Sequence, residues 1–181
     1  MEIRLEGAGD SEAIREVNLR AFGEAAEADL VERLRVCCDE LLSLVAEDHG
    51  EVIGHLQFSP VALVTPDRVL QGVGLAPMAV LPAWQRQGVG TALVREGLRR
   101  LRERHCPFVV VIGHPDFYPR FGFDRCSRYG IRCPWPEVPD EAFMVVLLDD
   151  LSIRESGGTL HYCPEFDQPE GHEKMLCPRR L

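Results

Sequence analysis

The sequence predicts a single-domain α/β protein, and three observations support this fold class. The chain has 181 residues, of which 45% are hydrophobic, so it can bury one core but is too short for two ordinary domains. Apolar runs typical of strands alternate with stretches in which apolar residues recur at helical spacing. In Gly72–Arg104, a buried strand, a glycine-containing loop and an amphipathic helix follow one another directly.

The first third of the chain is expected to form one strand and two helices. Ile3–Leu5 is typical of a short strand, and a helix follows it, with Asp10 or Ser11 as N-cap and Gly23 at its end. A second amphipathic helix is expected within Glu24–Val36, because its apolar residues share one face while charged residues occupy the others.

The middle of the chain predicts three strands. Leu42–Ala46 and Val52–Val64 are separated by an Asp-His-Gly turn, which favours a hairpin. Gly72–Val80 is apolar throughout and predicts a buried strand. Pro77 lies inside it and has no N–H to donate, so a bulge or a local loss of pairing is expected there.

The second half predicts one long helix and several shorter elements. The helix is expected over Val89–Arg104, and Pro107 prevents its continuation. Phe108–Ile112 is continuously apolar, as in a strand buried on both faces. The remaining expectations are a helical turn at Tyr118–Phe121, strands at Phe143–Leu148 and Thr159–Tyr162, and irregular structure over Arg125–Pro139.

Composition excludes several function classes. With 20 Lys and Arg against 29 Asp and Glu, the net charge of −9 argues against a grip on nucleic acid. No apolar run approaches the roughly 20 residues of a membrane span, and Met1–Arg4 does not resemble a signal peptide. The seven cysteines have no Cys-x-x-Cys spacing, and His161, Cys163, His172 and Cys177 are too loosely spaced for a metal set. We therefore expect a cytoplasmic protein with reduced thiols, no metal and no membrane or nucleic-acid partner.

The segment Gln85–Thr91 has the features of an anion site. The first amides of a helix lack internal partners, and the helix dipole places partial positive charge there. Gly88 and Gly90 have no Cβ, so a phosphate can approach the backbone, and Arg86 adds further donors. A dinucleotide fingerprint would need a third glycine where the chain has Leu93, and no Walker motif is present. The alternative is that the glycines serve only a tight turn.

Two motifs together carry a resemblance to a known family. Gln85-x-x-Gly88-x-Gly90, preceded by Met78–Pro82 and followed by Phe117–Phe123, resembles the GCN5-related N-acetyltransferase (GNAT) family. The segment Gly113–Tyr118 is similar to small predicted bacterial N-acetyltransferases of unassigned substrate. The resemblance covers roughly Ile3–Tyr162. We therefore expect residues 1–163 to form the domain and residues 164–181 to form a loosely held tail.

The resemblance implies the acyl-CoA N-acyltransferase fold. This is a mixed, bent sheet that is flanked by helices and splayed between its fourth and fifth strands to admit acetyl-CoA. Pro77 would lie where the fourth strand of the family bulges. The resemblance implies that the backbone of Met78, Ala79 and Val80 pairs with pantetheine, and that Arg86, Gln87, Gly88, Val89, Gly90 and Thr91 hold the pyrophosphate.

Transfer of an acetyl group to an amine needs a base for the ammonium, donors for the oxyanion and an acid for the leaving thiolate. Tyr118 lies four residues before Gly122, where family members carry the tyrosine that protonates the thiolate. The alternative is that Tyr118 only joins an aromatic cluster.

His114 is the candidate base because it follows the fifth expected strand and histidine titrates near neutrality. The alternatives are Asp116, Glu24 or Glu27 of the second helical segment, and water leading to a carboxylate.

The sequence thus predicts an N-acetyltransferase that moves an acetyl group from acetyl-CoA to a primary amine by direct attack. The alternative is a non-catalytic CoA-binding or regulatory module on the same fold. The acceptor is expected to be a small-molecule amine or a protein amine. The sequence does not distinguish between these acceptors, nor between a monomer and a homodimer.

Overall fold

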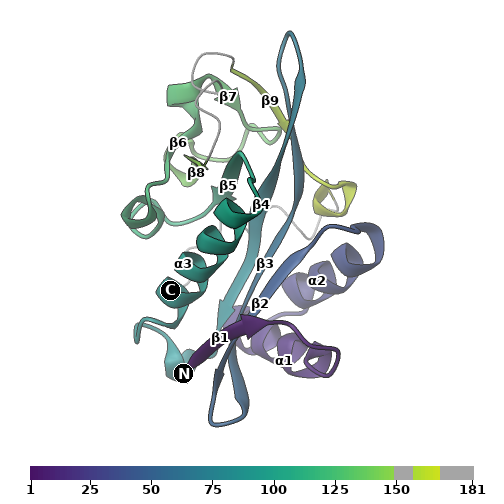
Figure 1. Ribbon diagram of the computed structural model, residues 1–181, viewed down its shortest axis with the longest axis vertical. Coiled ribbons are helices and arrows are strands. Elements are labelled where there is room, and N and C mark those ends of the chain that lie inside the picture. The colour runs from purple at the N-terminus through teal and green to yellow at the C-terminus, as the bar shows by residue number, and fades with distance from the viewer. Residues whose placement is uncertain (149–156, 168–181) are drawn as a thin grey trace.

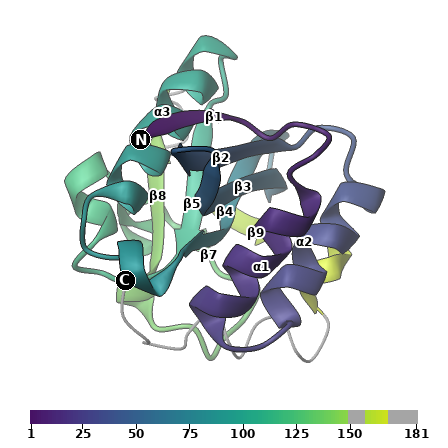
Figure 2. The same ribbon diagram turned by 90° about the horizontal axis from the view of Figure 1, so that it is seen from below.

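In the part of the chain that the computed structural model describes, residues 1–148 and 157–167, nine strands form one mixed sheet with helices on both faces (Figures 1 and 2). In chain order, the strands and α-helices are β1 (Glu2–Leu5), α1 (Ser11–Phe22), α2 (Ala26–Cys37), β2 (Leu42–Asp48), β3 (Glu51–Val64), β4 (Val69–Val80), α3 (Val89–Glu103), β5 (Phe108–Ile112), β6 (Asp124–Arg125), β7 (Ile131–Arg132), β8 (Phe143–Leu147) and β9 (Gly158–His161). Each longer strand and helix lies where the sequence predicts one.

The sheet order is β1-β2-β3-β4-β5-β8-β6, and β9 pairs with both β3 and β7. Neighbours are antiparallel except in the pairs β4–β5 and β7–β9, which are parallel. The sheet is therefore mixed, as expected. The two-residue strand β7 lies within Arg125–Pro139, where irregular structure was expected, and β6 overlaps its first residue. Strands so short show no period in the sequence.

The helices form two layers. Figure 2 shows α1 and α2 together on one face of the sheet and α3 on the other. The packing of α3 is close: a Cβ built at Gly54 of β3 would lie 3.0 Å from Val89 and 3.2 Å from Leu93. Leu93 and Leu98 are buried, while the arginines of α3 lie on its outer side.

Strands β4 and β5 part soon after they meet. They pair only at Val73 with Val109 and at Gly74 with Val110, whereas β5 pairs with β8 along its whole length. On its other edge β4 shifts register against β3, so that Ala76 and Pro77 together lie opposite one residue. The predicted irregularity at Pro77 and the predicted splay between the fourth and fifth strands are both confirmed.

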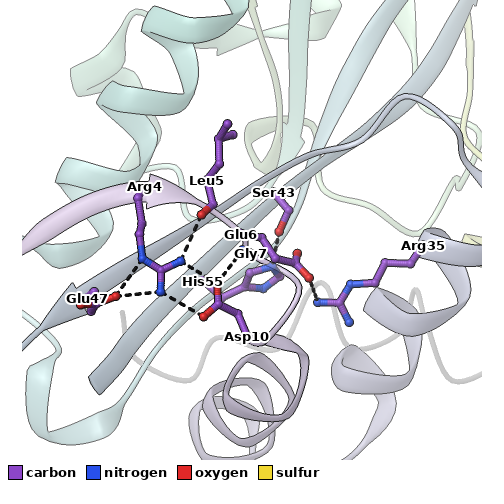
Figure 3. A network of polar contacts seen from close by, with 9 residues as sticks. All are labelled: Arg4, Leu5, Glu6, Gly7, Asp10, Arg35, Ser43, Glu47 and His55. Carbon is purple, nitrogen blue, oxygen red and sulfur yellow. Dashed lines mark hydrogen bonds and ion pairs between the residues drawn. The ribbon is translucent and has the colours of Figure 1, made fainter. Parts of the chain in front are cut away.

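The predicted N-cap position of α1 is confirmed, but the hydrogen bond typical of an N-cap side chain is absent. Asp10 occupies the N-cap position, but its side chain makes no cap hydrogen bond. Its carboxylate instead accepts hydrogen bonds from Arg4 at 2.6 and 3.0 Å and from the Gly7 amide at 2.6 Å (Figure 3). A charged guanidinium is a stronger donor than a helix amide. The same interaction lowers the pKa of Asp10 and ties β1 to the start of α1.

The expected C-terminal tail is ordered at its beginning. Pro164–Asp167 forms a 3-10 helix, and Phe166 is 1% exposed in an apolar cluster that also contains Leu160 and Trp135. The packed structure therefore extends beyond residue 163, and residues 168–181 lie outside the described part. No helix within the described ranges is both long and apolar enough to cross a bilayer.

His55 is buried in β3 as a neutral side chain. The Nδ2 amide of Asn18 lies 3.2 Å from its Nδ1, and its Nε2 lies 3.0 Å from Ser43 Oγ. Asn18 donates to Nδ1, so Nε2 carries the proton toward Ser43. Burial, with a smaller contribution from the Arg35 charge, lowers the pKa of His55 to about 3. Arg35 is itself paired with Glu6, and the charged atoms of this ion pair are 2.6 Å apart (Figure 3).

This burial predicts a pH-dependent stability. Above pH 6.5, His55 is neutral in both states and its stabilising contribution is complete. As the pH falls from 6.5 toward 3, the unfolded chain binds a proton that the folded protein excludes, so the free energy of unfolding decreases. The free energy of unfolding measured with urea should therefore be about 2 kcal/mol lower at pH 5 than at pH 7 because of His55. His55→Gln should remove most of the difference. His161 is exposed on β9, so the control variant His161→Gln should retain the difference.

Candidate active site

The loop between β4 and α3 leaves a set of amides facing outward. After β4 ends at Val80, a 3-10 turn over Pro82–Trp84 leads to Arg86 with φ +60° and Gly88 with φ +91°. The Gly88 carbonyl accepts the hydrogen bond of the Ala92 amide at 2.9 Å, so the amides between them open the helix without an intrahelical acceptor. The structure therefore has the outward-facing helix amides that an anion site needs, and anion binding by this loop stays a prediction.

The backbone conformation at position 88 requires glycine. An L side chain rarely adopts φ +91°, and a Cβ built at Gly88 would meet no atom within 4 Å. The backbone at Gly88 is therefore left-handed, and the space around its Cβ position is open. A ligand can approach this backbone from the side on which other residues carry a Cβ.

A cavity of about 440 Å³ lies against this loop. Its lining residues come from β4, the loop, the first turn of α3 and the segment after β5: Met78, Val80, Trp84, Gln85, Arg86, Gly88, Gly90, Thr91, Phe117 and Arg120. Among these described residues two are arginines and none is acidic. A protein with a net charge of −9 thus has a locally basic cavity at a helix N-terminus.

Six of the predicted cofactor-binding residues line this cavity, and three do not. Ala79 points to the other face of β4, because side chains alternate along a strand. Val89 is buried against β3, and the Gln87 side chain donates to the Ala83 carbonyl at 2.7 Å. For Ala79 the prediction concerns the backbone alone, and for all three residues contact with the cofactor stays a prediction.

The sequence did not predict roles for Trp84, Gln85, Phe117 and Arg120. Gln85 donates to the Val80 carbonyl at 3.0 Å and so holds the loop against the end of β4. The Arg120 guanidinium lies 4.8 Å from the centre of the Phe117 ring. Gln85, Phe117 and Arg120 lie within the two motifs, so a signal was present. Only the fold shows that the two motifs meet at one cavity.

The cavity opens toward an unpaired strand edge. Beyond Gly74, the edge of β4 that faces β5 has no strand partner in residues 1–148 or 157–167. Met78 and Val80 lie on this segment and also line the cavity. Extended backbone with free donors and acceptors can pair with an amide-containing chain as a strand would.

Tyr118 is held beside the cavity in an aromatic cluster. It is 4% exposed, and its ring packs edge-on against Phe117 and Phe123 with centroid distances of 5.1 and 5.5 Å. A Cβ at Gly113 would lie 2.4 Å from the Tyr118 ring, so only glycine allows the ring this position after β5. Its hydroxyl makes no hydrogen bond within the described chain. Burial raises the pKa of Tyr118, which keeps the phenol protonated at neutral pH.

His114 lies in the turn between β5 and Tyr118. Its backbone carbonyl accepts hydrogen bonds from the amides of Phe117 and Tyr118 at 3.0 and 3.4 Å. Its imidazole is half-buried and makes no hydrogen bond to another described residue. Asp116 is exposed, and its carbonyl accepts from Arg120 at 3.1 Å. The fold therefore places the two predicted catalytic residues on one short turn.

No metal centre is formed by the described residues. Within residues 1–148 and 157–167, no group of three or more His, Cys, Asp or Glu side chains is arranged to hold a metal ion. His172 and Cys177, which the sequence analysis weighed as ligands, lie outside these ranges. The expectation of a metal-independent protein stays a prediction.

Comparison with known proteins gives matches along most of the chain. Residues 2–126 match the family described as the acetyltransferase (GNAT) domain. The uncharacterized N-acetyltransferase YhbS of Escherichia coli (strain K12) is 40% identical over 169 residues, which are 93% of this chain and 99% of that protein. The crystal structure of YhbS from Escherichia coli in complex with CoA matches with a TM-score of 0.84 and 38% identity over 92% of each chain. A GNAT family acetyltransferase from Brucella melitensis in complex with acetyl-CoA matches with a TM-score of 0.73 and 32% identity, over 92% of this chain and 97% of that chain.

Proposed function

The chain belongs to the GNAT family of N-acetyltransferases, and from this premise we propose that it transfers an acetyl group from acetyl-CoA to a primary amine by direct attack. The observation that carries the proposal is the basic cavity at the start of α3, which continues into the unpaired edge of β4. The similar structures that contain CoA and acetyl-CoA support the same cosubstrate here.

The two ends of the cavity suit different parts of acetyl-CoA. The pyrophosphate is placed at the loop, where the amides around Gly88 and the Arg86 guanidinium supply hydrogen bonds and positive charge. The pantetheine amides are placed along Met78–Val80, where β4 has no strand partner on the side of β5. This arrangement directs the thioester toward the splay between β4 and β5, next to the turn that holds Tyr118.

The proposed chemistry uses two residues of that turn. His114 accepts the proton of the acceptor ammonium, and the resulting amine attacks the thioester carbonyl. Collapse of the tetrahedral intermediate then breaks the C–S bond. Tyr118, whose raised pKa keeps the phenol protonated at neutral pH, donates its proton to the departing thiolate and regains one from the nitrogen that attacked, while the proton held by His114 passes to solvent. No step requires a metal, so prolonged chelation should leave the activity intact.

The proposal is tested by binding and by turnover. Calorimetry should detect CoA binding, and release of the CoA thiol from acetyl-CoA should accelerate when a responsive primary amine is added from a panel of polyamines, aminoglycosides and lysine- or N-terminal-amine peptides. CoA binding without any amine-dependent thiol release would favour a non-catalytic CoA-binding module. Absence of CoA binding would contradict the assignment of the cavity.

We place the reaction in the cytoplasm, where the six described free cysteines would remain reduced.

Arg120 is expected to contribute to binding of the cosubstrate, although the sequence did not predict it. Arg120→Gln removes one of the two cations that line the cavity and should weaken CoA binding several-fold. The effect should shrink at high salt, because the contribution of an exposed charge is screened. Calorimetry at low and high salt measures it. Arg99→Gln, on the outer side of α3 and paired with Glu96, is the matched control and should bind CoA as the wild type does. Equal affinities of the Arg120 variant and the wild type would exclude this role.

His114→Ala is expected to change the pH profile without changing cosubstrate affinity. If the imidazole accepts the ammonium proton, the pH profile of kcat/KM for the variant should lose its acidic limb, while CoA affinity stays near that of the wild type. The carbonyl of residue 114 still accepts its two amides, so the turn should persist. If the variant retains the limb at a similar rate, the base is Asp116, a glutamate or water.

A further inference from the structure

Three cysteine thiols meet on the face of the sheet that carries α1 and α2. Cys37 ends α2, Cys38 follows it, and Cys163 follows β9. The Sγ atoms of Cys38 and Cys163 are 3.2 Å apart, and those of Cys37 and Cys38 are 3.3 Å apart. Cys38 and Cys163 are separated by 125 positions in the chain, so only the fold brings them together.

The surroundings hold these thiols in place and in the protonated form. Cys163 also donates to the Pro60 carbonyl at 3.4 Å, which fixes its sulfur next to β3. Burial, with a smaller contribution from the hydrogen bond with Cys163, raises the pKa of Cys38 to about 11. The pKa of Cys163 is also raised by burial. Both groups are therefore neutral thiols near pH 7, and they lie in contact without repelling each other.

We propose that Cys38 and Cys163 form an oxidisable thiol pair that closes to a disulfide when the protein meets a peroxide. One thiol, as its thiolate, attacks a peroxide oxygen to give a sulfenic acid and water; the other then attacks the sulfenic sulfur and releases a second water. The two sulfurs together lose two electrons and two protons, and hydrogen peroxide is reduced to two waters. A thiol reductant reverses the reaction.

The alternative pair, Cys37 and Cys38, is disfavoured by its covalent geometry. A bond between adjacent residues closes a small, strained ring, whereas Cys38 and Cys163 belong to separate elements that can each adjust. Their sulfurs need to approach by only about 1.2 Å to reach a bond length of about 2.05 Å.

The cross-link would join the end of α2 to the 3-10 helix at Pro164–Asp167. Leu34 of α2 and Phe166 of that helix already lie in one apolar cluster, so the bond would reinforce an existing contact. It would also close a long loop and restrict the unfolded chain, which raises thermal stability. None of these residues lines the cavity at the start of α3, so the inference does not rest on the proposed function.

Peptide mapping of the full-length protein after treatment with hydrogen peroxide tests the inference. Trypsin places Cys37 and Cys38 in one peptide, Cys163 in a second and Cys177 in a third, because it cleaves after Arg35, Arg68, Arg154 and Lys174. The expected product links the first two peptides, disappears with dithiothreitol and raises Tm by several degrees. The matched variant Cys37→Ser should form the same link, which assigns it to Cys38.

Cys163→Ser should abolish both the link and the rise in Tm, and Cys106→Ser should abolish neither. A link confined to the peptide that contains both Cys37 and Cys38, a link to Cys177, a link between two copies of the chain, or oxidation to sulfinic acid without a link would each overturn the inference.

Discussion

Gly88→Glu is expected to reduce CoA affinity by more than tenfold while the protein stays folded. Gly88 lines the cavity, and its Cβ position is open, so a glutamate side chain would enter the space assigned to the pyrophosphate. Its carboxylate would repel the phosphates and offset the positive end of the α3 dipole. Calorimetric titration with CoA measures the change, and circular dichroism verifies the fold.

The left-handed backbone at Gly88 requires a control for strain. Gly50 in the β2–β3 turn has φ +83°, and its Cβ position is also open, so Gly50→Glu introduces the same side chain under similar strain away from the cavity. We expect that variant to lose some stability and to keep its CoA affinity. If Gly88→Glu binds CoA as Gly50→Glu does, the pyrophosphate does not occupy this loop.

Those parts of the fold that depend on local chemistry were predictable from the sequence. The absence of an N–H at Pro77 is a property of one residue, and it predicted the irregular pairing of β4. The apolar spacing of α3 predicted both its limits and its buried side. The hydrogen-bond partner of Asp10 could not be predicted in this way, because Arg4 of β1 competes with the helix amides for the same carboxylate.

Long-range contacts account for what the sequence missed. The burial of Phe166 depends on Leu160 and Trp135, which are brought together by pairing of short strands without a readable period. Likewise, the resemblance predicted roles for the loop before α3 and for Tyr118, but it did not predict that Arg120 lines the same cavity. The comparisons confirm the family, whereas the roles of individual side chains stay predictions that substitution must test.

The basic cavity also explains how an acidic protein can bind an anionic cosubstrate. Long-range repulsion by a net charge of −9 is screened beyond about 8 Å at physiological ionic strength, so the groups within the cavity dominate there. Arg86, Arg120 and the start of α3 all border the cavity in which we propose that the phosphates bind.

Tyr118→Phe is expected to lower the single-turnover rate of acetyl transfer about 100-fold or more, which corresponds to about 2.7 kcal/mol of transition-state free energy. The substitution deletes one hydroxyl and keeps the ring that packs against Phe117 and Phe123. That hydroxyl has no hydrogen bond within the described chain, so its loss leaves no protein group newly unpaired. CoA affinity should change by less than about threefold, because a thioester sulfur in the ground state is a poor acceptor and the phenol interacts strongly only as charge develops.

Two variants separate the hydroxyl from the ring. Tyr129→Phe removes a hydroxyl from a tyrosine of the other apolar cluster and should leave the rate unchanged. Gly113→Ala keeps the Tyr118 hydroxyl but displaces the ring, since the new Cβ would lie 2.4 Å from it, so the rate should fall although the acid is present. Rapid-quench measurement with an amine that proves active avoids masking by product release. Transfer by Tyr118→Phe at the wild-type rate would show that another group protonates the thiolate and that Tyr118 serves only to pack the aromatic cluster.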